Sequence, residues 1–251
     1  MEGYQLIPWG YLYDILYSDY DADIEYYLSC AAKYGERVLE LGCGTGRITL
    51  ALARKGHKVT GVDVSETLLD ELRRKALGQS FDLDIVHQNM AELDLGKTYD
   101  LVIIPFRAFA HVHDQAQQIQ TLLHIRRHLV PQGHLCLNVF MPDYDYMDRM
   151  NNVPYLKKIV SHHDKSITWT AQSTFDFFAQ EVRVNNLIEV FDMHGTLEQK
   201  YCLPHTLRWV SPAELRLMLQ STGYREVHIY GDLQRNALTS ESKEIVCEAI
   251  A

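Results

Sequence analysis

The chain has 251 residues, with 33 Asp or Glu and 24 Lys or Arg, which gives a formal net charge of −9. Hydrophobic residues make up 47% and charged residues 23%, a balance typical of globular proteins and not of disordered or fibrous ones. The acidic charge disfavours nucleic acid as a partner, because binding a phosphate backbone requires a basic face. No apolar run is long enough to span a membrane and no basic-apolar leader begins the chain, so we expect a cytoplasmic protein without a membrane partner.

Cysteine and histidine spacing predicts no metal site. The five cysteines are scattered and form no C-x-x-C pair, which indicates reduced thiols rather than a disulfide framework or a zinc ribbon. Two close histidine pairs occur, His111/His113 and His162/His163, but neither has the H-x-x-x-H or H-E-x-x-H spacing of a metal site. We therefore interpret the histidines as scattered polar surface residues and not as metal ligands.

Between residues 37 and 140, short apolar runs alternate with longer amphipathic ones. The predicted strands are 37–41, 58–63, 84–87, 99–105 and 135–140; the predicted helices are 47–55, one capped by Ser65 and ended by Gly78, and 114–128. Strands that alternate with helices form right-handed βαβ units. The pattern predicts an α/β fold with a Rossmann-like, open, mostly parallel sheet and helices on both of its faces.

Residues 160–210 have a different pattern, because polar and apolar residues alternate there with period two. Strands are expected at 167–175 and 182–190, joined by a hairpin, with a third β-rich run at 197–210. Ser211-Pro-Ala-Glu214 then starts a helix, and strands 226–230 and 244–249 are expected to close the core sheet as an antiparallel pair. The predicted domains are an N-terminal helical lid at 1–35, a core at 36–145 and 211–251, and an inserted antiparallel β cap at 146–210.

A glycine loop lies directly between the first predicted strand and the first predicted helix. It reads Glu40-Leu-Gly-Cys-Gly-Thr-Gly46. Three glycines in five residues allow a tight turn and a close approach of the backbone to a ligand, at the sheet edge where open α/β sheets bind ligands. The loop therefore predicts a binding site.

The residues around this loop limit the class of ligand that it can bind. A dinucleotide loop would need a third glycine where Arg47 stands, and the Gly-Lys-Ser/Thr of a phosphate-binding loop is absent. Glu40 would repel a diphosphate but suits an ammonium group. Asp63 ends the second strand, where a carboxylate can accept hydrogen bonds from the two hydroxyls of a ribose. The expected ligand carries a ribose and an amine but no phosphate.

These motifs, with the Gln88-Asn89-Met90 turn and the 99–105 strand, resemble the class I S-adenosylmethionine-dependent methyltransferases. The resemblance covers residues 37–140 and extends to the final hairpin, and it implies S-adenosylmethionine as the cofactor. It implies that the loop glycines line the methionine moiety, that Glu40 lies near the amino group and that Asp63 holds the ribose. The implied cofactor-binding set is Glu40, Gly42, Cys43, Gly44, Gly46, Asp63, Val64, Asn89, Met90, Pro105 and Tyr17.

One residue departs from the family pattern. Many members have Asp at the position of Asn89 to take the adenine amino group. The amide oxygen of Asn89 can still accept that hydrogen bond, but without the added strength of a charge. Met90 is interpreted either as a polarizable wall beside the purine or as an ordinary core methionine.

The residues on the acceptor side are less specific. In similar small-molecule methyltransferases a tyrosine-rich N-terminal helix closes over the cofactor, which here implies Tyr13 and Tyr17, although their helical spacing also suits packing alone. His111, next to the segment that follows the fourth strand, is the first candidate for a general base, ahead of Tyr13 and His205. The predicted substrate-binding residues are Arg107, Trp169 and His205, with surface and core roles as the alternatives for the first two.

The sequence predicts a methyltransferase that acts on a small molecule at an amine nitrogen or a hydroxyl oxygen, by in-line displacement and as a monomer or homodimer. A non-catalytic S-adenosylmethionine-binding subunit shares every cofactor residue and is the alternative from another class. A protein or tRNA methyltransferase is the third, although the acidic charge disfavours RNA.

Overall fold

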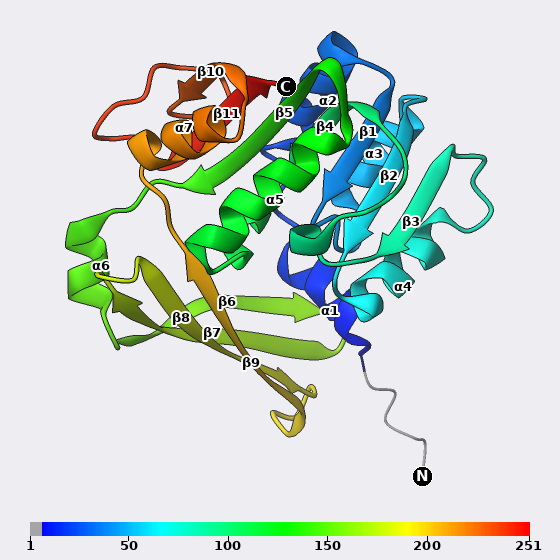
Figure 1. The fold of residues 1–251 in the computed structure, drawn as a ribbon. Coiled ribbons are helices and arrows are strands. Elements are labelled where there is room, and N and C mark those ends of the chain that lie inside the picture. Colours follow the sequence, from blue (N-terminus) through cyan, green and yellow to red (C-terminus); the bar gives the residue numbers. More distant parts are fainter. Residues whose placement is uncertain (1–6) are drawn as a thin grey trace. The chain divides into compact units, whose positions relative to one another are not determined.

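The computed structural model describes residues 7–251, which fold into two compact units (Figure 1). The α/β unit comprises Tyr20–Pro142 and Trp209–Ala251. The antiparallel unit comprises the described residues up to Asp19 together with Asp143–Arg208. This division differs from the expected one at the N-terminus, because the first helix belongs to the antiparallel unit and the second to the α/β unit.

The α/β unit contains a seven-stranded sheet with the order β10-β11-β5-β4-β1-β2-β3. Its strands are β1 (Arg37–Leu41), β2 (Lys58–Asp63), β3 (Leu83–His87), β4 (Tyr99–Ile104), β5 (Leu129–Phe140), β10 (Arg225–Tyr230) and β11 (Glu244–Ile250). Strands β1 to β5 run parallel, and β11 is antiparallel to both β5 and β10. The expected mostly parallel sheet, closed by an antiparallel pair, is confirmed.

Helices cover both faces of this sheet because alternate strand residues point to opposite sides. On one face, Leu39 and Ile104 pack with α5 (Gln115–Arg127) and α7 (Pro212–Ser221). On the other, Val38 and Ile103 pack with α2 (Ile24–Tyr34) and α3 (Arg47–Arg54). The remaining helical elements are α4 (Glu66–Ala76) and the 3₁₀ turns η1 (Met90–Glu92) and η2 (Ala108–His111).

Two predicted helix caps are present and one is not. The Asp114 side chain accepts the backbone N–H of Gln117 at 2.9 Å, and Ser211 accepts that of Glu214 at 3.1 Å. Ser65 precedes α4 but its side chain makes no capping bond, and its hydroxyl lies 3.1 Å from that of Thr67. The prediction that Ser65 caps α4 is therefore wrong, because its hydroxyl lies beside Thr67 instead.

The antiparallel unit has a four-stranded sheet with the order β6-β7-β8-β9. Its elements are α1 (Trp9–Leu16), α6 (Tyr144–Met150), β6 (Pro154–His162), β7 (Lys165–Asp176), β8 (Glu181–Phe191) and β9 (Leu197–Arg208). Strand β6 was not predicted, because a bulge interrupts its alternation between Leu156 and Lys158. Within residues 7–251, no helix combines the length and apolar character that crossing a bilayer requires.

Candidate active site

The glycine loop is positioned by packing on both of its sides. A Cβ atom at Gly42, where φ is +75°, would lie 2.6 Å from the Cβ of Ala108, and one at Gly46, where φ is +86°, would lie 2.2 Å from Leu72 Cδ1. At Gly44 the same addition would meet only Leu68 Cδ1, at 3.9 Å. The outer glycines are therefore required by the fold, whereas the space beside Gly44 is open to a ligand.

Asp63 joins the glycine loop to the end of β2. Its Oδ2 accepts the backbone N–H of Gly44 at 2.8 Å, and its Oδ1 accepts that of Ser65 at 2.8 Å. Each carboxylate oxygen has a second lone pair, so two further hydrogen bonds can be accepted from a ligand. The next residue, Val64, is 66% exposed at the same strand end.

Glu40 is buried at the end of β1 and accepts a hydrogen bond from the Thr49 hydroxyl. Burial raises the pKa of Glu40 to about 8, against the opposing effects of the Thr49 hydrogen bond and the Arg47 charge. Burial likewise raises the pKa of the Cys43 thiol. Cys43 packs closely against β2, since a Cβ at Gly61 would lie 3.1 Å from its sulfur.

The turn after β3 leaves Asn89 exposed but partly buries Met90. Asn89 is exposed and caps η1, where its Oδ1 accepts the Ala91 N–H at 3.0 Å. Met90 is half-buried, and its methyl group would lie 3.6 Å from a Cβ at Gly42. Met90 also packs against the main core cluster, so it contacts both the loop and the core.

The segment after β4 begins with buried Pro105 and then takes an unusual backbone path. Phe106 and Arg107 have φ values of +54° and +64°, a conformation that costs free energy for residues with side chains. The Arg107 guanidinium forms an ion pair with Glu244 of β11. His111 is exposed at the end of η2.

The sequence did not identify a buried ion pair beside the loop. Arg47, the first residue of α3, pairs with Asp23, which is 0% exposed, and its Nη2 donates to Asp23 Oδ2 at 3.0 Å. The guanidinium lies 4.9 Å from the ring centroid of Tyr20 and 5.4 Å from that of Phe106. This pair connects the glycine loop with the start of α2. Sequence spacing could not show which carboxylate reaches Arg47.

The remaining predicted residues belong to the antiparallel unit. The rings of Tyr13 on α1 and of Tyr17 just after it lie 4.6 Å apart, and burial raises the pKa of Tyr17 to about 12. The Trp169 indole N–H donates to Asn186 Oδ1 at 2.8 Å, and Asn186 Nδ2 lies 3.3 Å from His205 Nδ1. Asn186 therefore connects the two residues that the sequence proposed for the substrate.

The structure sorts the predicted residues into two sets. The glycine loop, Asp63, Met90 and the segment after Pro105 meet at the carboxyl edge of the parallel sheet. Tyr17 and Trp169 contact each other in the antiparallel unit, with ring centroids 5.3 Å apart. Arg107 forms an ion pair with Glu244 of β11. In the sheet, β11 and β2 lie on opposite sides of β1, the strand that leads into the glycine loop.

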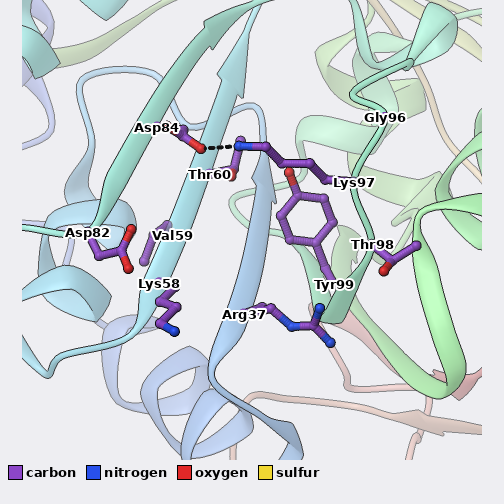
Figure 2. A pocket seen from close by; sticks show the side chains of 10 residues that line it. All are labelled: Arg37, Lys58, Val59, Thr60, Asp82, Asp84, Gly96, Lys97, Thr98 and Tyr99. Atoms are coloured by element: carbon purple, nitrogen blue, oxygen red, sulfur yellow. Dashed lines mark hydrogen bonds and ion pairs between the residues drawn. The ribbon is translucent and has the colours of Figure 1, made fainter.

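A cavity of about 430 Å³ lies at the opposite edge of the parallel sheet (Figure 2). Arg37, Lys58 and Tyr99 line it at the starts of β1, β2 and β4, where Figure 2 also shows the Lys97–Asp84 ion pair. The glycine loop follows the end of β1, whereas this cavity adjoins its beginning. The cavity is therefore separate from the candidate site.

The residues at the carboxyl edge fit a nucleoside with an amino group better than a metal or a diphosphate. Asp63 and Glu40 supply carboxylates, and the open side of Gly44 allows close backbone approach. Over residues 7–251 there is no group of three or more His, Cys, Asp or Glu side chains arranged to hold a metal ion. The chemistry of the donors agrees with S-adenosylmethionine.

The chain is similar to known methyltransferases. Residues 38–133 match the family model described as a methyltransferase domain. The chain is 28% identical to the cypemycin N-terminal methyltransferase of a Streptomyces species over 212 residues, which span 84% of this chain and 82% of that protein. Among solved structures, the CcbJ methyltransferase of Streptomyces caelestis is 28% identical, with a TM-score of 0.77 and 94% of each chain covered.

A second solved structure supports the fold. The S-adenosylmethionine-dependent methyltransferase of Clostridium acetobutylicum is 16% identical, with a TM-score of 0.79 over 95% of this chain and 96% of that one. The matches extend well beyond the glycine loop, since both structures cover nearly the whole chain. Residues 38–133 therefore form a methyltransferase domain, and this match together with the two methyltransferases that are 28% identical over most of the chain supports an S-adenosylmethionine-dependent methyltransferase.

Proposed function

We propose that this enzyme transfers the methyl group of S-adenosylmethionine to the nitrogen of a small-molecule amine. The observation that supports nitrogen is the similarity to the cypemycin N-terminal methyltransferase over 84% of this chain. The ubiquinone biosynthesis O-methyltransferase of Aeromonas salmonicida is 30% identical but matches only 54% of the chain. The relative named as an N-terminal methyltransferase therefore aligns with a larger share of this chain than the O-methyltransferase does.

The cofactor roles are proposed from the geometry of the carboxyl edge. Gly44 gives the methionine moiety access to the backbone, Glu40 attracts its ammonium group and Asp63 accepts the ribose hydroxyls. The other residues proposed to line this site are Gly42, Cys43, Gly46, Val64, Asn89, Met90 and Pro105. When bound, the sulfonium supplies an activated methyl group with a good leaving group.

The chain's own task is to align the acceptor, exclude water and remove a proton from the amine. An amine is nucleophilic only as the free base, so a group that takes its proton assists the reaction. We propose His111 for this role. Arg107 is proposed to contact the acceptor.

A radiolabelled methyl-transfer screen tests the proposal. The purified protein is incubated with S-adenosyl[methyl-³H]methionine and panels of amines, phenols, thiols and carboxylates. We expect label to appear on amines and not on the oxygen or sulfur acceptors. Label on phenols alone would overturn the choice of nitrogen, and cofactor binding without transfer to any panel would favour the non-catalytic subunit. Transfer to protein or tRNA would favour the macromolecular alternative.

Cofactor binding is also expected to release a proton from Glu40. Burial raises the pKa of Glu40 to about 8, so its carboxyl is mostly protonated at pH 7. A ligand ammonium beside it favours the ionised form, so affinity should rise with pH up to about 8, by at most about tenfold per pH unit. Calorimetry of S-adenosylhomocysteine binding at pH 7 in phosphate and in Tris measures the release.

In that experiment the apparent binding enthalpy should differ between the two buffers. The Glu40→Gln variant serves as the control, because an amide of the same shape has no proton to release. Equal enthalpies in both buffers for the unmodified protein would show that Glu40 does not respond to the ligand's amino group.

A further inference from the structure

The turn that follows β4 has a backbone conformation that its residues do not favour. The Ala108 N–H donates to the Pro105 carbonyl at 3.1 Å, which closes a turn with Phe106 and Arg107 at its centre. Both central residues have positive φ, +54° and +64°, and turns of this kind usually carry Gly, Asn or Asp there. Residues with larger side chains keep such a conformation only where their surroundings impose it. Contacts outside the turn therefore hold it in place.

The same turn lies directly against the glycine loop. A Cβ atom at Gly42 would lie 2.6 Å from the Cβ of Ala108. The ring centroid of Phe106 lies 5.4 Å from Cζ of Arg47, the residue that follows the loop and begins α3. The turn therefore contacts the first glycine of the loop and the residue after its last glycine. A movement of the turn changes the shape of the proposed cofactor site.

An ion pair connects the centre of the turn to β11. Arg107 donates to Glu244 Oε1 from Nε, at 3.0 Å, and from Nη2. The Arg107 side chain is 46% exposed and that of Glu244 18%, so the carboxylate is the more buried partner. Glu244 is the first residue of β11 and pairs with Phe140, the last residue of β5. The sheet therefore fixes the backbone of Glu244 at the carboxyl edge, where the turn also lies.

Two buried polar side chains fix the Glu244 carboxylate. Asn138 Nδ2 donates to Glu244 Oε2 at 2.9 Å, and Asn138 Oδ1 accepts the Tyr27 hydroxyl at 2.9 Å. A carboxylate only accepts, so the amide nitrogen faces Glu244 and the amide oxygen faces Tyr27. Tyr27 and Asn138 are both 0% exposed, and buried polar groups cost free energy unless they have partners. Packing alone would be served by apolar residues at these two positions, so the arrangement indicates a role in placing Glu244.

We propose that Glu244, held by Asn138, is a positioning residue for cofactor binding, because it keeps the strained turn at 105–108 against the glycine loop; this inference rests on the cofactor site of the proposed function. Glu244 acts through Arg107 and the turn, so it needs no contact with the cofactor. Without the carboxylate, the turn can relax out of the positive-φ region, and its contacts with the loop change. The loop then no longer has the shape that the nucleoside fits.

Isothermal titration calorimetry of the full-length protein with S-adenosylhomocysteine tests the proposal. Glu244→Ala is expected to weaken binding about tenfold, because the charged hydrogen bonds that hold the turn are lost. Asp100→Ala is the matched control. Asp100 pairs with Arg37 at 2.7 Å at the opposite edge of the sheet, and its carboxylate and the guanidinium are 24% and 47% exposed, close to the values for Glu244 and Arg107. This control should bind within about twofold of the unmodified protein.

Two substitutions of Arg107 separate backbone strain from the loss of an ion pair. Arg107→Ala and Arg107→Gly remove the same guanidinium, but only glycine adopts positive φ without a steric cost. Arg107→Ala should weaken S-adenosylhomocysteine binding about tenfold, whereas Arg107→Gly should stay within about threefold of the unmodified protein. This pair of variants also decides the proposal if Glu244→Ala does not fold, because the Arg107 side chain is largely exposed.

Unchanged affinity in Glu244→Ala would overturn the proposal, as would equal affinities of Arg107→Ala and Arg107→Gly or an equal loss in Asp100→Ala. Failure of the proposed function is recognised separately, because the unmodified protein then does not bind S-adenosylhomocysteine. In that case hydrogen exchange of the Ala108 amide in the free protein decides whether Glu244 holds the turn. We expect exchange at least about tenfold faster in Glu244→Ala and unchanged in Asp100→Ala. Equal exchange rates in the two variants would overturn the positioning role.

Discussion

Replacing Asp63 by alanine is expected to weaken S-adenosylhomocysteine binding by at least about 100-fold. The carboxylate accepts the Gly44 N–H at 2.8 Å and the Ser65 N–H at 2.8 Å, so it holds the loop in shape as well as offering lone pairs to a ribose. Alanine removes both contributions. Isothermal titration calorimetry at neutral pH gives the two dissociation constants directly.

Asp70→Ala is the matched control for this prediction. Asp70 is a carboxylate on the neighbouring helix α4, is largely exposed and pairs with Arg73 at 2.8 Å. Its loss should leave nucleoside affinity unchanged, because surface ion pairs contribute little to stability. Circular dichroism of both variants shows whether they fold. A folded Asp63→Ala protein with the affinity of the unmodified enzyme would refute the ribose assignment.

Replacing Asp23 by alanine should lower the free energy of unfolding by about 3–5 kcal/mol. Asp23 is 0% exposed and is paired with Arg47, so its removal leaves a guanidinium partly buried without its carboxylate. The aromatic rings of Tyr20 and Phe106 beside Arg47 offer only weak compensation. Urea denaturation followed by tryptophan fluorescence measures the change.

An exposed aspartate provides the comparison for Asp23. Asp84 pairs with Lys97 at 2.6 Å, and both side chains are more than half exposed. Asp84→Ala should cost no more than about 1 kcal/mol. The double variant Asp23→Ala/Arg47→Met should recover part of the loss, because no unpaired charge then stays buried. Equal losses for the two aspartates would mean that the Asp23 pair is not buried in solution.

Local patterns were enough to predict most of the α/β unit. Short apolar runs separated by amphipathic helices mark β1 to β5, and the central strands β1, β2 and β4 are buried on both faces. The glycine loop could be recognised because the tight turn and positive φ at Gly42 and Gly46 are requirements of neighbouring residues. Asp63 could be recognised from its position alone, because it is the last residue of a predicted strand.

Local patterns failed where a residue's role depends on the register or on a distant partner. Strand β6 was missed because the bulge at Lys157 breaks its alternation. The cap expected at Ser65 is absent. The sequence also gave no indication that the Lys157 ammonium lies over the ring of Trp169. Each of these depends on neighbours that the chain brings close only by folding.

By itself the sequence determined the sheet class, the glycine loop and the position of Asp63, because these follow from periodicity and from spacing within a few dozen residues. Only the tertiary structure decided that Arg107 pairs with Glu244, 137 residues away, and that Asn186 joins Trp169 to His205. Such contacts are set by strand register and sheet order, which bring distant residues together, and local periodicity carries no record of either.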